Sequence, residues 1–421
     1  MREIEQVYPA LERLYGPDAP AQKGRYRLLL DSFEELFGSQ GRQVRFFSAP
    51  GRSEIIGNHT DHQRGRVVAA AINLDAIAAA ARRDDGWVCI QSKGYPIDRV
   101  DMSQPGPVKE EAGTSAALIR GMAAELKRRG YRAGGFDAYT TSQVLKGSGL
   151  SSSAAFEVLV GGIINGLFND GRIPPQEIAM AAQKVENRYF GKPSGLMDQM
   201  ASAVGGLVAI DFRDPGAPLI EPIDCDFSTS GYVLCVVDTG GDHTSLTASY
   251  AAITEEMKMV ARQMGKDCLR EVDPDELYAS LGKLRRVCGD RALLRACHFV
   301  EENERAGELR DALEAGDYRA FKQLILKSGR SSFEYLQNVV SPGNAQEQGL
   351  SLALLLSERL LSGRGAWRVH GGGFAGTILA FVPEDMLDAY REEMESVFGQ
   401  GSCYALRVRQ AGMTELLPDG T

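Results

Sequence analysis

The sequence has no run of eighteen consecutive apolar residues, and its first residues lack the basic start and apolar stretch of a signal peptide. None of its seven cysteines forms a CxxC pair, and such scattered thiols are typical of a reducing compartment. The net charge of −9 disfavours nucleic acid and anionic membranes as partners. These absences predict a cytoplasmic protein without nucleic-acid or membrane partners, and we expect it to be a monomer.

Three familiar nucleotide-binding and catalytic motifs are also missing. The P-loop pattern GxxxxGK[ST] occurs nowhere in the chain. A nucleophile elbow, GxSxG, would need a glycine where Ser153 stands. A literal GxGxxG does occur at Gly371, Gly373 and Gly376, but it leads into the strand-like segment TILAFV. Because a dinucleotide fingerprint leads into a helix, this context does not predict a Rossmann site.

The composition is that of an ordinary globular protein, with 43% hydrophobic and 24% charged residues. Since single cores rarely exceed about 250–300 residues, a chain of 421 residues indicates more than one domain. We predict an N-terminal extension over residues 1–24, a first domain over 25–210 and a second over 211–421. Long helical stretches are expected in the second domain at 245–265, 275–287, 290–303, 306–328 and 345–362. The predicted fold class is α+β.

A segment rich in glycine and serine, LKGSGLSSSAAFEVLVGG at 145–162, carries the strongest physical signal. Its glycines let the backbone approach a ligand, and a helix that is apolar on all sides follows. Free N–H groups and the dipole at a helix start attract an anion, so we predict a phosphate-binding loop. The alternative is a flexible linker that ends in a serine cap. The residues expected at the phosphate are Gly147, Ser148, Gly149, Leu150, Ser151, Ser152 and Ser153.

Two acidic residues and one polar segment are further candidates. Glu186 stands near the end of an amphipathic helix, and Asp198 follows a Lys-Pro-Ser-Gly turn among apolar neighbours. A carboxylate in such company is either functional or the cap of the next helix, and the residues alone leave both open. Upstream, polar side chains crowd the segment RSEIIGNHTDH, from Arg52 to His62, which indicates a binding site.

Four segments together resemble a known family. APGRSEIIGNHTDH, GSGLSSSA and HGGGFAGT occur in the order found in the GHMP kinases, named for galactokinase, homoserine, mevalonate and phosphomevalonate kinases. The first segment closely resembles the galactokinase signature APGR-x-N-x-IGEHTDY. The stretch ENRYFGKPSGLMDQ resembles the galactokinase stretch that ends in CGIMDQ. The similarity covers about residues 25–415, and four motifs in register are far more specific than any one of them.

The resemblance implies a two-domain GHMP kinase fold with its active site at the domain interface. The implied activity is transfer of phosphate from ATP to O1 of a sugar, with Mg²⁺ as a cofactor. Asp198 matches the family's catalytic aspartate, which accepts or orients the anomeric hydroxyl, and Arg52 matches the arginine that stabilises charge. The candidate substrate contacts are Asn58, His59, Asp61, Gly195, Tyr250 and Glu54. Ser153 and Glu186 match the positions that hold magnesium.

The first motif departs from the family pattern at three positions. Glu54 replaces an asparagine, Asn58 replaces a glutamate and His62 replaces a tyrosine. The family's glutamate recognises the C6 hydroxyl and would repel an acid there, by roughly 4 kcal/mol for charges about 4 Å apart, or around a thousandfold in affinity. Asn58 removes that repulsion but can still bind a hydroxyl, and Glu54 can restore the carboxylate from a neighbouring position. Galactose is therefore the expected substrate, with galacturonate or another C6-modified sugar as the alternative.

Two further alternatives concern the same segments. Some galactokinase relatives bind sugar and ATP only to signal, but they tend to lose catalytic loop residues, whereas Arg52, Asp198 and the SSSA sequence are intact here. The HTDH sequence contains three potential ligands for a transition metal, His59, Asp61 and His62. Such side chains in a tight turn are more often hydrogen-bonded locally, so this site is the weaker hypothesis.

Overall fold

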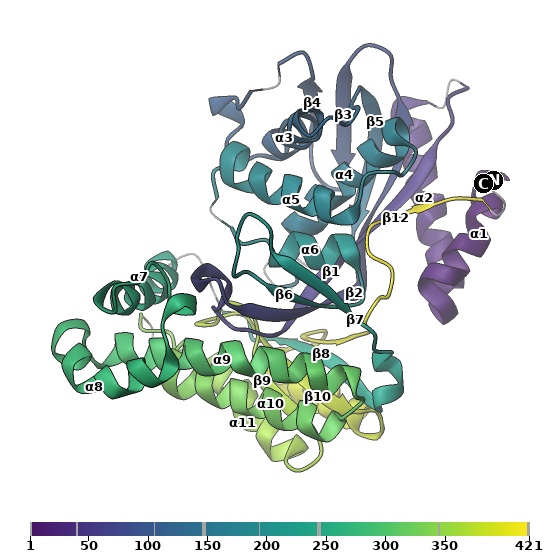
Figure 1. Ribbon diagram of the computed structural model, residues 1–421. Helices are drawn as coiled ribbons and strands as arrows, with labels where there is room; N and C mark the ends of the chain where they lie inside the picture. Colours follow the sequence, from purple (N-terminus) through teal and green to yellow (C-terminus); the bar gives the residue numbers. More distant parts are fainter. Residues whose placement is uncertain are drawn as a thin grey trace.

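The computed structural model describes residues 2–38, 41–104, 106–144, 149–192, 194–241, 246–343 and 346–418, without the side chains of Arg2, Glu3 and Thr247. Two sheets with helices on both sides form two stacked halves of the molecule (Figure 1). This α+β architecture confirms the predicted fold class. No helix in the described ranges is long and apolar enough to cross a membrane.

The first sheet has eight strands in the order β12-β1-β2-β5-β3-β4, and β6 and β7 continue it from β2. Its strands are β1 Arg45–Ile56, β2 Arg66–Arg82, β3 Trp87–Ser92, β4 Ile97–Asp101, β5 Phe136–Ser142, β6 Leu207–Asp211, β7 Leu219–Ile223 and β12 Thr414–Leu416. Every neighbouring pair is antiparallel except β3 and β5. The long strand β2 pairs first with β6 and then with β5, so it joins both ends of the sheet.

The alanine run of β2 is a strand whose two faces are both buried. Ala76, Ala78 and Ala80 pack into the main core with the helices of one face, while Ile77 and Ala79 pack into a second core on the other. Alternate side chains of a strand point to opposite faces, so small residues at both sets of positions let helices approach from each side. The helices of the first face are α3 Ser115–Arg128, α4 Ser152–Asn169, α5 Pro175–Val185 and α6 Met197–Val204.

The other face of the first sheet is covered by the N-terminal helices α1 Arg2–Tyr15 and α2 Ala19–Phe37. Leu11 of α1 and Tyr26 of α2 are fully buried in their shared core. Residues 1–24 were expected to form an N-terminal extension before the first domain. Instead, α2 begins inside that range, and both helices pack on the sheet.

The second sheet has four antiparallel strands in the order β11-β8-β10-β9. They are β8 Tyr232–Asp238, β9 Ala366–Val369, β10 Thr377–Pro383 and β11 Cys403–Leu406. The helices of this half are α7 Thr247–Gln263, α8 Pro274–Cys288, α9 Asp290–Glu314, α10 Tyr318–Ser331, α11 Gly349–Leu361 and α12 Leu387–Phe398. After β11, the chain returns to the first sheet and pairs there as β12 (Figure 1).

The expected break between helices at residues 304–305 is wrong. Helix α9 runs through it to Glu314, because no glycine or proline interrupts the helix there. The break lies at Gly316 and Asp317, where the Asp317 carboxylate accepts hydrogen bonds from the first N–H groups of α10. The expected domain division at residue 210 stays a prediction. The chain passes from the first sheet to the second between β7 and β8.

Candidate active site

A cavity of about 180 Å³ lies where the end of β1, the loop after it and the glycine turn before β10 meet. It is lined by Arg52, Glu54, Gly57, Asn58, His59, Asp61, Val67, Met197, Gly371 and Gly372. Five of the expected site residues from the first motif therefore share one cavity with the third motif. We call residues Gly57–Arg64 the sugar loop. Gly57 has φ of 107°, and a Cβ there would lie 2.7 Å from Val67 Cα, so only glycine allows this turn.

Arg52, on the cavity lining, forms an ion pair with Asp198. Arg52 Nε donates to Asp198 Oδ1 at 2.7 Å, and the hydroxyl of Ser151 donates to Oδ2 at 2.6 Å. Arg52 also donates to the carbonyl of Gly149, which ties it to the glycine-serine loop. Burial raises the pKa of Asp198, but the charge of Arg52 and these two hydrogen bonds outweigh burial, so the net pKa is lowered. Asp198 is therefore an ionised acceptor at neutral pH.

The glycine-serine loop leads into α4 as expected, although Gly147 and Ser148 lie outside the described residues. Ser151 occupies the N-cap position with φ of 60° but makes no side-chain cap bond, because its hydroxyl is directed to Asp198. The simple serine-cap alternative is therefore wrong at this residue. Leu150 is buried, whereas Ser152 and Ser153 in the first turn of α4 keep partial exposure.

Two of the expected sugar contacts, Asp61 and Gly195, adjoin each other. A Cβ on Gly195 would lie 2.3 Å from Asp61 Oδ2, so the carboxylate fits only because residue 195 has no side chain. Burial raises the pKa of Asp61, and the nearby charges of Glu54 and Asp198 raise it further. Glu54 and Asp61 on the cavity lining and Asp198, which pairs with the lining residue Arg52, are thus close enough for their charges to influence one another.

The remaining expected contacts lie against the third motif. His59 Nε2 donates to the carbonyl of Gly372 at 3.0 Å, and Tyr250 donates its hydroxyl to the carbonyl of Gly373 at 2.9 Å. The ring of Tyr250 also packs on Gly372, where a Cβ would approach within 2.6 Å of it. Tyr250 thus packs behind the glycine turn of the cavity wall and is not itself a lining residue.

Asn58 is fully buried, and protein groups occupy its amide. Its Nδ2 donates to Glu54 Oε1 at 3.1 Å and to the carbonyl of Gly371. Its Oδ1 accepts from Asn338 at 2.7 Å and from Ser332 at 3.3 Å. An amide offers two donors and two acceptor sites, and all four are used here. Asn58 therefore links the sugar loop to the second half of the molecule.

Sequence reasoning missed the buried residues of α9 that hold the sugar loop. Glu302 Oε1 accepts the N–H groups of Gly57 and Asn58 at 3.2 and 3.3 Å, and His298 Nε2 donates to the carbonyl of Asn58 at 3.0 Å. Glu302 and His298 are completely buried. No local pattern marks them, because they lie about 240 positions from their partners and sit on an ordinary helix.

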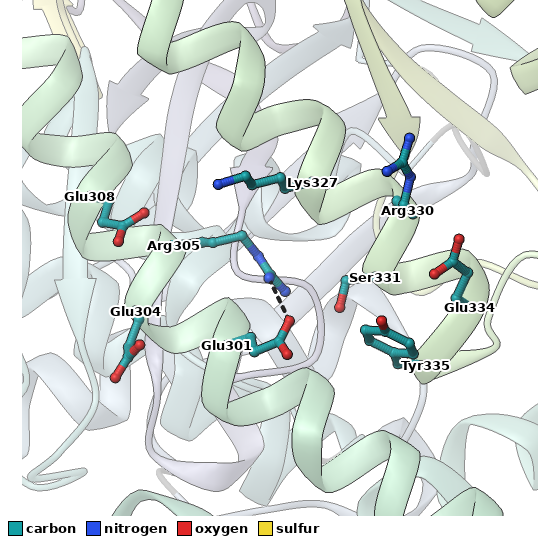
Figure 2. Close-up of a pocket in the computed structure, with 9 residues that line it drawn as sticks. All are labelled: Glu301, Glu304, Arg305, Glu308, Lys327, Arg330, Ser331, Glu334 and Tyr335. Carbon is teal, nitrogen blue, oxygen red and sulfur yellow. Dashed lines mark hydrogen bonds and ion pairs between the residues drawn. The ribbon is translucent and has the colours of Figure 1, made fainter. Parts of the chain in front are cut away.

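The charge of Glu302 is balanced from the far side by Arg305. Arg305 Nε donates to Glu302 Oε2 at 2.8 Å, and its Nη1 donates to Glu301 at 3.0 Å. Figure 2 shows the Glu301 contact on the wall of a separate hollow of about 370 Å³ between α9 and α10. Burial would raise the pKa of Glu302, but Arg305 and its neighbours lower it to about 2. Glu302, which accepts backbone N–H groups of the sugar loop, therefore stays ionised at physiological pH.

Glu186, the candidate metal residue, is buried on the turn Glu186–Phe190 after α5. Its carboxylate accepts from Lys192 and from Gln199, each at 2.8 Å. Gln199 also donates to Glu157, which lies one turn after Ser153 on α4. Burial and the charge of Glu186 raise the pKa of Glu157 to about 9. Gln199 thereby connects Glu186 to the helix that carries Ser153.

The transition-metal hypothesis gains no support from the sugar loop. Within the described ranges, no three His, Cys, Asp or Glu side chains are grouped to hold a metal ion. His59 is committed to Gly372, and Asp61 accepts the backbone N–H of His62 at 2.8 Å. Burial lowers the pKa of His62 to about 3, so its ring is neutral. The turn is hydrogen-bonded locally.

Comparisons with known proteins agree with this geometry. A model of the galactokinase galactose-binding signature matches residues 31–82, and a model of the GHMP kinases N terminal domain matches residues 117–206. A galactokinase of Streptomyces coelicolor is 33% identical over 386 residues, which cover 90% of this chain and 95% of that protein. The structure of Lactococcus lactis galactokinase complexed with galactose matches with a TM-score of 0.77 and 25% identity, over 92% of this chain and 99% of that one. Mevalonate kinase from Methanococcus jannaschii matches with a TM-score of 0.61 and 15% identity, over 87% and 98% of the two chains, a likeness of fold.

Proposed function

The chain belongs to the galactokinase family of GHMP kinases, and from this premise we propose that it transfers the γ-phosphoryl group of ATP to O1 of galactose. The single observation that carries this proposal is the pair of Asp198 with Arg52 of the cavity lining, joined by Ser151 from the loop before α4. This pair supports the proposal because it joins Arg52 of the cavity lining to an ionised acceptor that Ser151 of the predicted phosphate loop also contacts.

The lowered pKa of Asp198 suits orientation better than early proton removal. Phosphoryl transfer proceeds through a loose transition state that needs little covalent help, so an aligned hydroxyl and neutralised charge suffice. Asp198 accepts the hydrogen bond of the anomeric hydroxyl and takes its proton as the new P–O bond forms. Arg52 keeps Asp198 ionised and offsets the charge that develops on the transferred group.

ATP would enter as its magnesium complex, and we assign the ion to Ser153 and Glu186. Magnesium prefers one or two carboxylates together with phosphate oxygens and water, and this pair supplies oxygen donors of that kind. The ion would neutralise the phosphate oxygens during transfer. Glu186→Gln should raise the magnesium concentration needed for half-maximal rate at fixed ATP. An unchanged requirement would remove Glu186 from the assignment.

The sensor and galacturonate alternatives are less well supported. A protein that only signals has no need of the paired Arg52 and Asp198. The galacturonate alternative rested on Asn58, whose amide is occupied by protein groups. We also propose that the chain works as a monomer in the cytoplasm, and its seven free thiols support a reducing compartment.

The test is a panel of sugars with Mg-ATP, covering galactose, galacturonate, arabinose, galactosamine and N-acetylgalactosamine. ADP release measures the rate, and phosphorus NMR identifies the product. Galactose should give the highest kcat/KM and a phosphate on O1. A protein that binds galactose and ATP without turnover would instead support the sensor alternative.

A further inference from the structure

Positions 54 and 58 carry glutamate and asparagine, the reverse of the family pattern, and the two side chains touch. Asn58 Nδ2 donates to Glu54 Oε1 at 3.1 Å. The two residues lie on neighbouring parts of the same cavity wall. Relative to the family pattern, the carboxylate is therefore at residue 54 and not at residue 58. The cavity lining still contains a carboxylate in this region.

The surroundings of each position explain why the exchange suits this chain. The Asn58 amide must donate to the Gly371 carbonyl and to Glu54. A carboxylate at residue 58 would instead face that carbonyl with an acceptor, which is repulsive. Glu54 has a donor behind it, because Nη2 of the fully buried Arg368 lies 3.1 Å from Oε1. A buried carboxylate needs such a partner, and among the described residues Glu54 contacts a cation whereas Asn58 contacts none.

The two oxygens of Glu54 have different environments. Oε1 accepts from both Asn58 and Arg368. Oε2 has no hydrogen-bond partner among the residues that the structure describes, and Glu54 retains 6% exposure on the cavity wall. An acceptor of this kind is suited to a hydroxyl donor from a ligand, with hydrogen bonds to charged groups stronger than neutral ones.

We propose that Glu54, in place of residue 58, binds the C6 hydroxyl of the sugar and thereby selects a neutral hexose over its uronic acid. The inference rests on the proposed function and deepens it. Glu54 and Asp61 make the cavity lining acidic, while Arg52 is committed to Asp198 and Arg368 to Glu54. A uronate would add a further negative charge beside Oε2, with no uncommitted cation on the lining.

The decisive variant is Glu54→Gln. Both partners of Oε1 are donors, so the amide carbonyl must take the inner position and the NH₂ group must face the cavity. The acceptor for a hydroxyl then becomes a donor, and the charge of Arg368 is no longer balanced. We expect kcat/KM for galactose to fall by about 10- to 100-fold. The ratio of galactose to galacturonate should fall further, by about 100- to 1000-fold.

Three substrates separate the contributions: galactose, 6-deoxygalactose and galacturonate. The wild-type enzyme should prefer galactose to 6-deoxygalactose by at least about 10-fold, and Glu54→Gln should lose most of that preference. Glu54→Asp keeps the negative charge but moves the carboxylate away from the cavity, because the side chain is shorter. This variant should still reject galacturonate, and its preference for galactose over 6-deoxygalactose should be smaller than that of the wild-type enzyme. Glu304→Gln, an exposed carboxylate on α9 outside the cavity lining, is the matched control and should leave all three ratios unchanged.

Circular dichroism and the melting temperature show whether each variant is folded. A folded Glu54→Gln enzyme with wild-type ratios would overturn the proposal. Equal use of galactose and galacturonate by the wild-type enzyme would also overturn it, and this result requires no variant. A wild-type protein that phosphorylates no hexose would instead refute the proposed function itself, so the two failures are distinguishable.

Discussion

Nε of Arg52 lies 2.7 Å from Oδ1 of Asp198, although 146 positions separate the two residues in the chain. Arg52 belongs to β1 and Asp198 to the first turn of α6. Ser151, from the loop before α4, occupies the other carboxylate oxygen. Three segments of the first half thus converge on one carboxylate, and the chemistry that we propose depends on its charge and orientation.

Removal of the Asp198 charge should abolish most turnover. Asp198→Asn should lower kcat by about 10²–10⁴-fold, the range for loss of a general base, with a smaller change in galactose affinity. Arg52→Ala should lower kcat by about 10²–10³-fold through loss of charge stabilisation. Steady-state kinetics and galactose titration by calorimetry give the two quantities. Full turnover in either variant would contradict the assigned mechanism.

Gly195→Ala should impair sugar binding while the fold remains intact. The new methyl group would lie 2.3 Å from Asp61 Oδ2, so the carboxylate must move out of its place in the cavity. Residue 195 is exposed and needs no positive φ, so the backbone accepts alanine. We expect KM for galactose to rise at least about 10-fold, the loss of one charge-assisted hydrogen bond. Gly282→Ala, which meets no atom within 4 Å, is the control, and an equal effect in both variants would contradict this explanation.

Glu302→Gln should weaken the hydrogen bonds by which α9 holds the backbone of the sugar loop. The change leaves Arg305 without its buried counter-charge and weakens the acceptor for the N–H groups of Gly57 and Asn58. Loss of one partner of a buried ion pair costs about 3–5 kcal/mol of unfolding free energy. Denaturant unfolding measures this cost, and KM for galactose should rise as well. Glu301→Gln removes only the more exposed partner of Arg305 and should have a much smaller effect on both.

Acidification should destabilise the protein partly through His298. Its Nε2 must donate to the carbonyl of Asn58, so Nδ1 accepts from Ser331 and the ring is neutral. Burial lowers its pKa to about 4, below the usual 6.5. As the pH falls, His298 is therefore protonated in the unfolded chain before it is protonated in the folded protein. Its contribution to the free energy of unfolding is fully present above pH 6.5 and is lost as the pH falls toward 4.

Replacement of His298 isolates this contribution. His298 can contribute at most about 1.4 kcal/mol per pH unit to the slope of unfolding free energy in that window. His298→Gln should reduce the slope between pH 6.5 and 4 relative to wild type, measured by urea unfolding at each pH. His62 and His370 have pKa values lowered in the same direction and remain in both proteins. Identical slopes would show that His298 is not the titrating group.

Local patterns in the sequence were enough to predict much of the scaffold. The buried helix α4 followed from its apolar circumference. The site residues Arg52, His59, Asp61 and Asp198 came from motifs whose members are close in sequence. Helix boundaries were less certain, because α9 has no local signal to end at residue 304.

The sequence by itself determined the family, marked Arg52 and Asp198 as the candidate catalytic pair, and contained the unusual pair of residues at 54 and 58. Only the tertiary structure decided which groups that pair contacts. Asn58 is occupied by groups from Gly371, Ser332 and Asn338, and Glu54 is backed by Arg368, all more than 270 positions away along the chain. The physical reason is that a side chain's role depends on its neighbours' donors, acceptors and charges. Those neighbours are assembled by packing of the second half against the first.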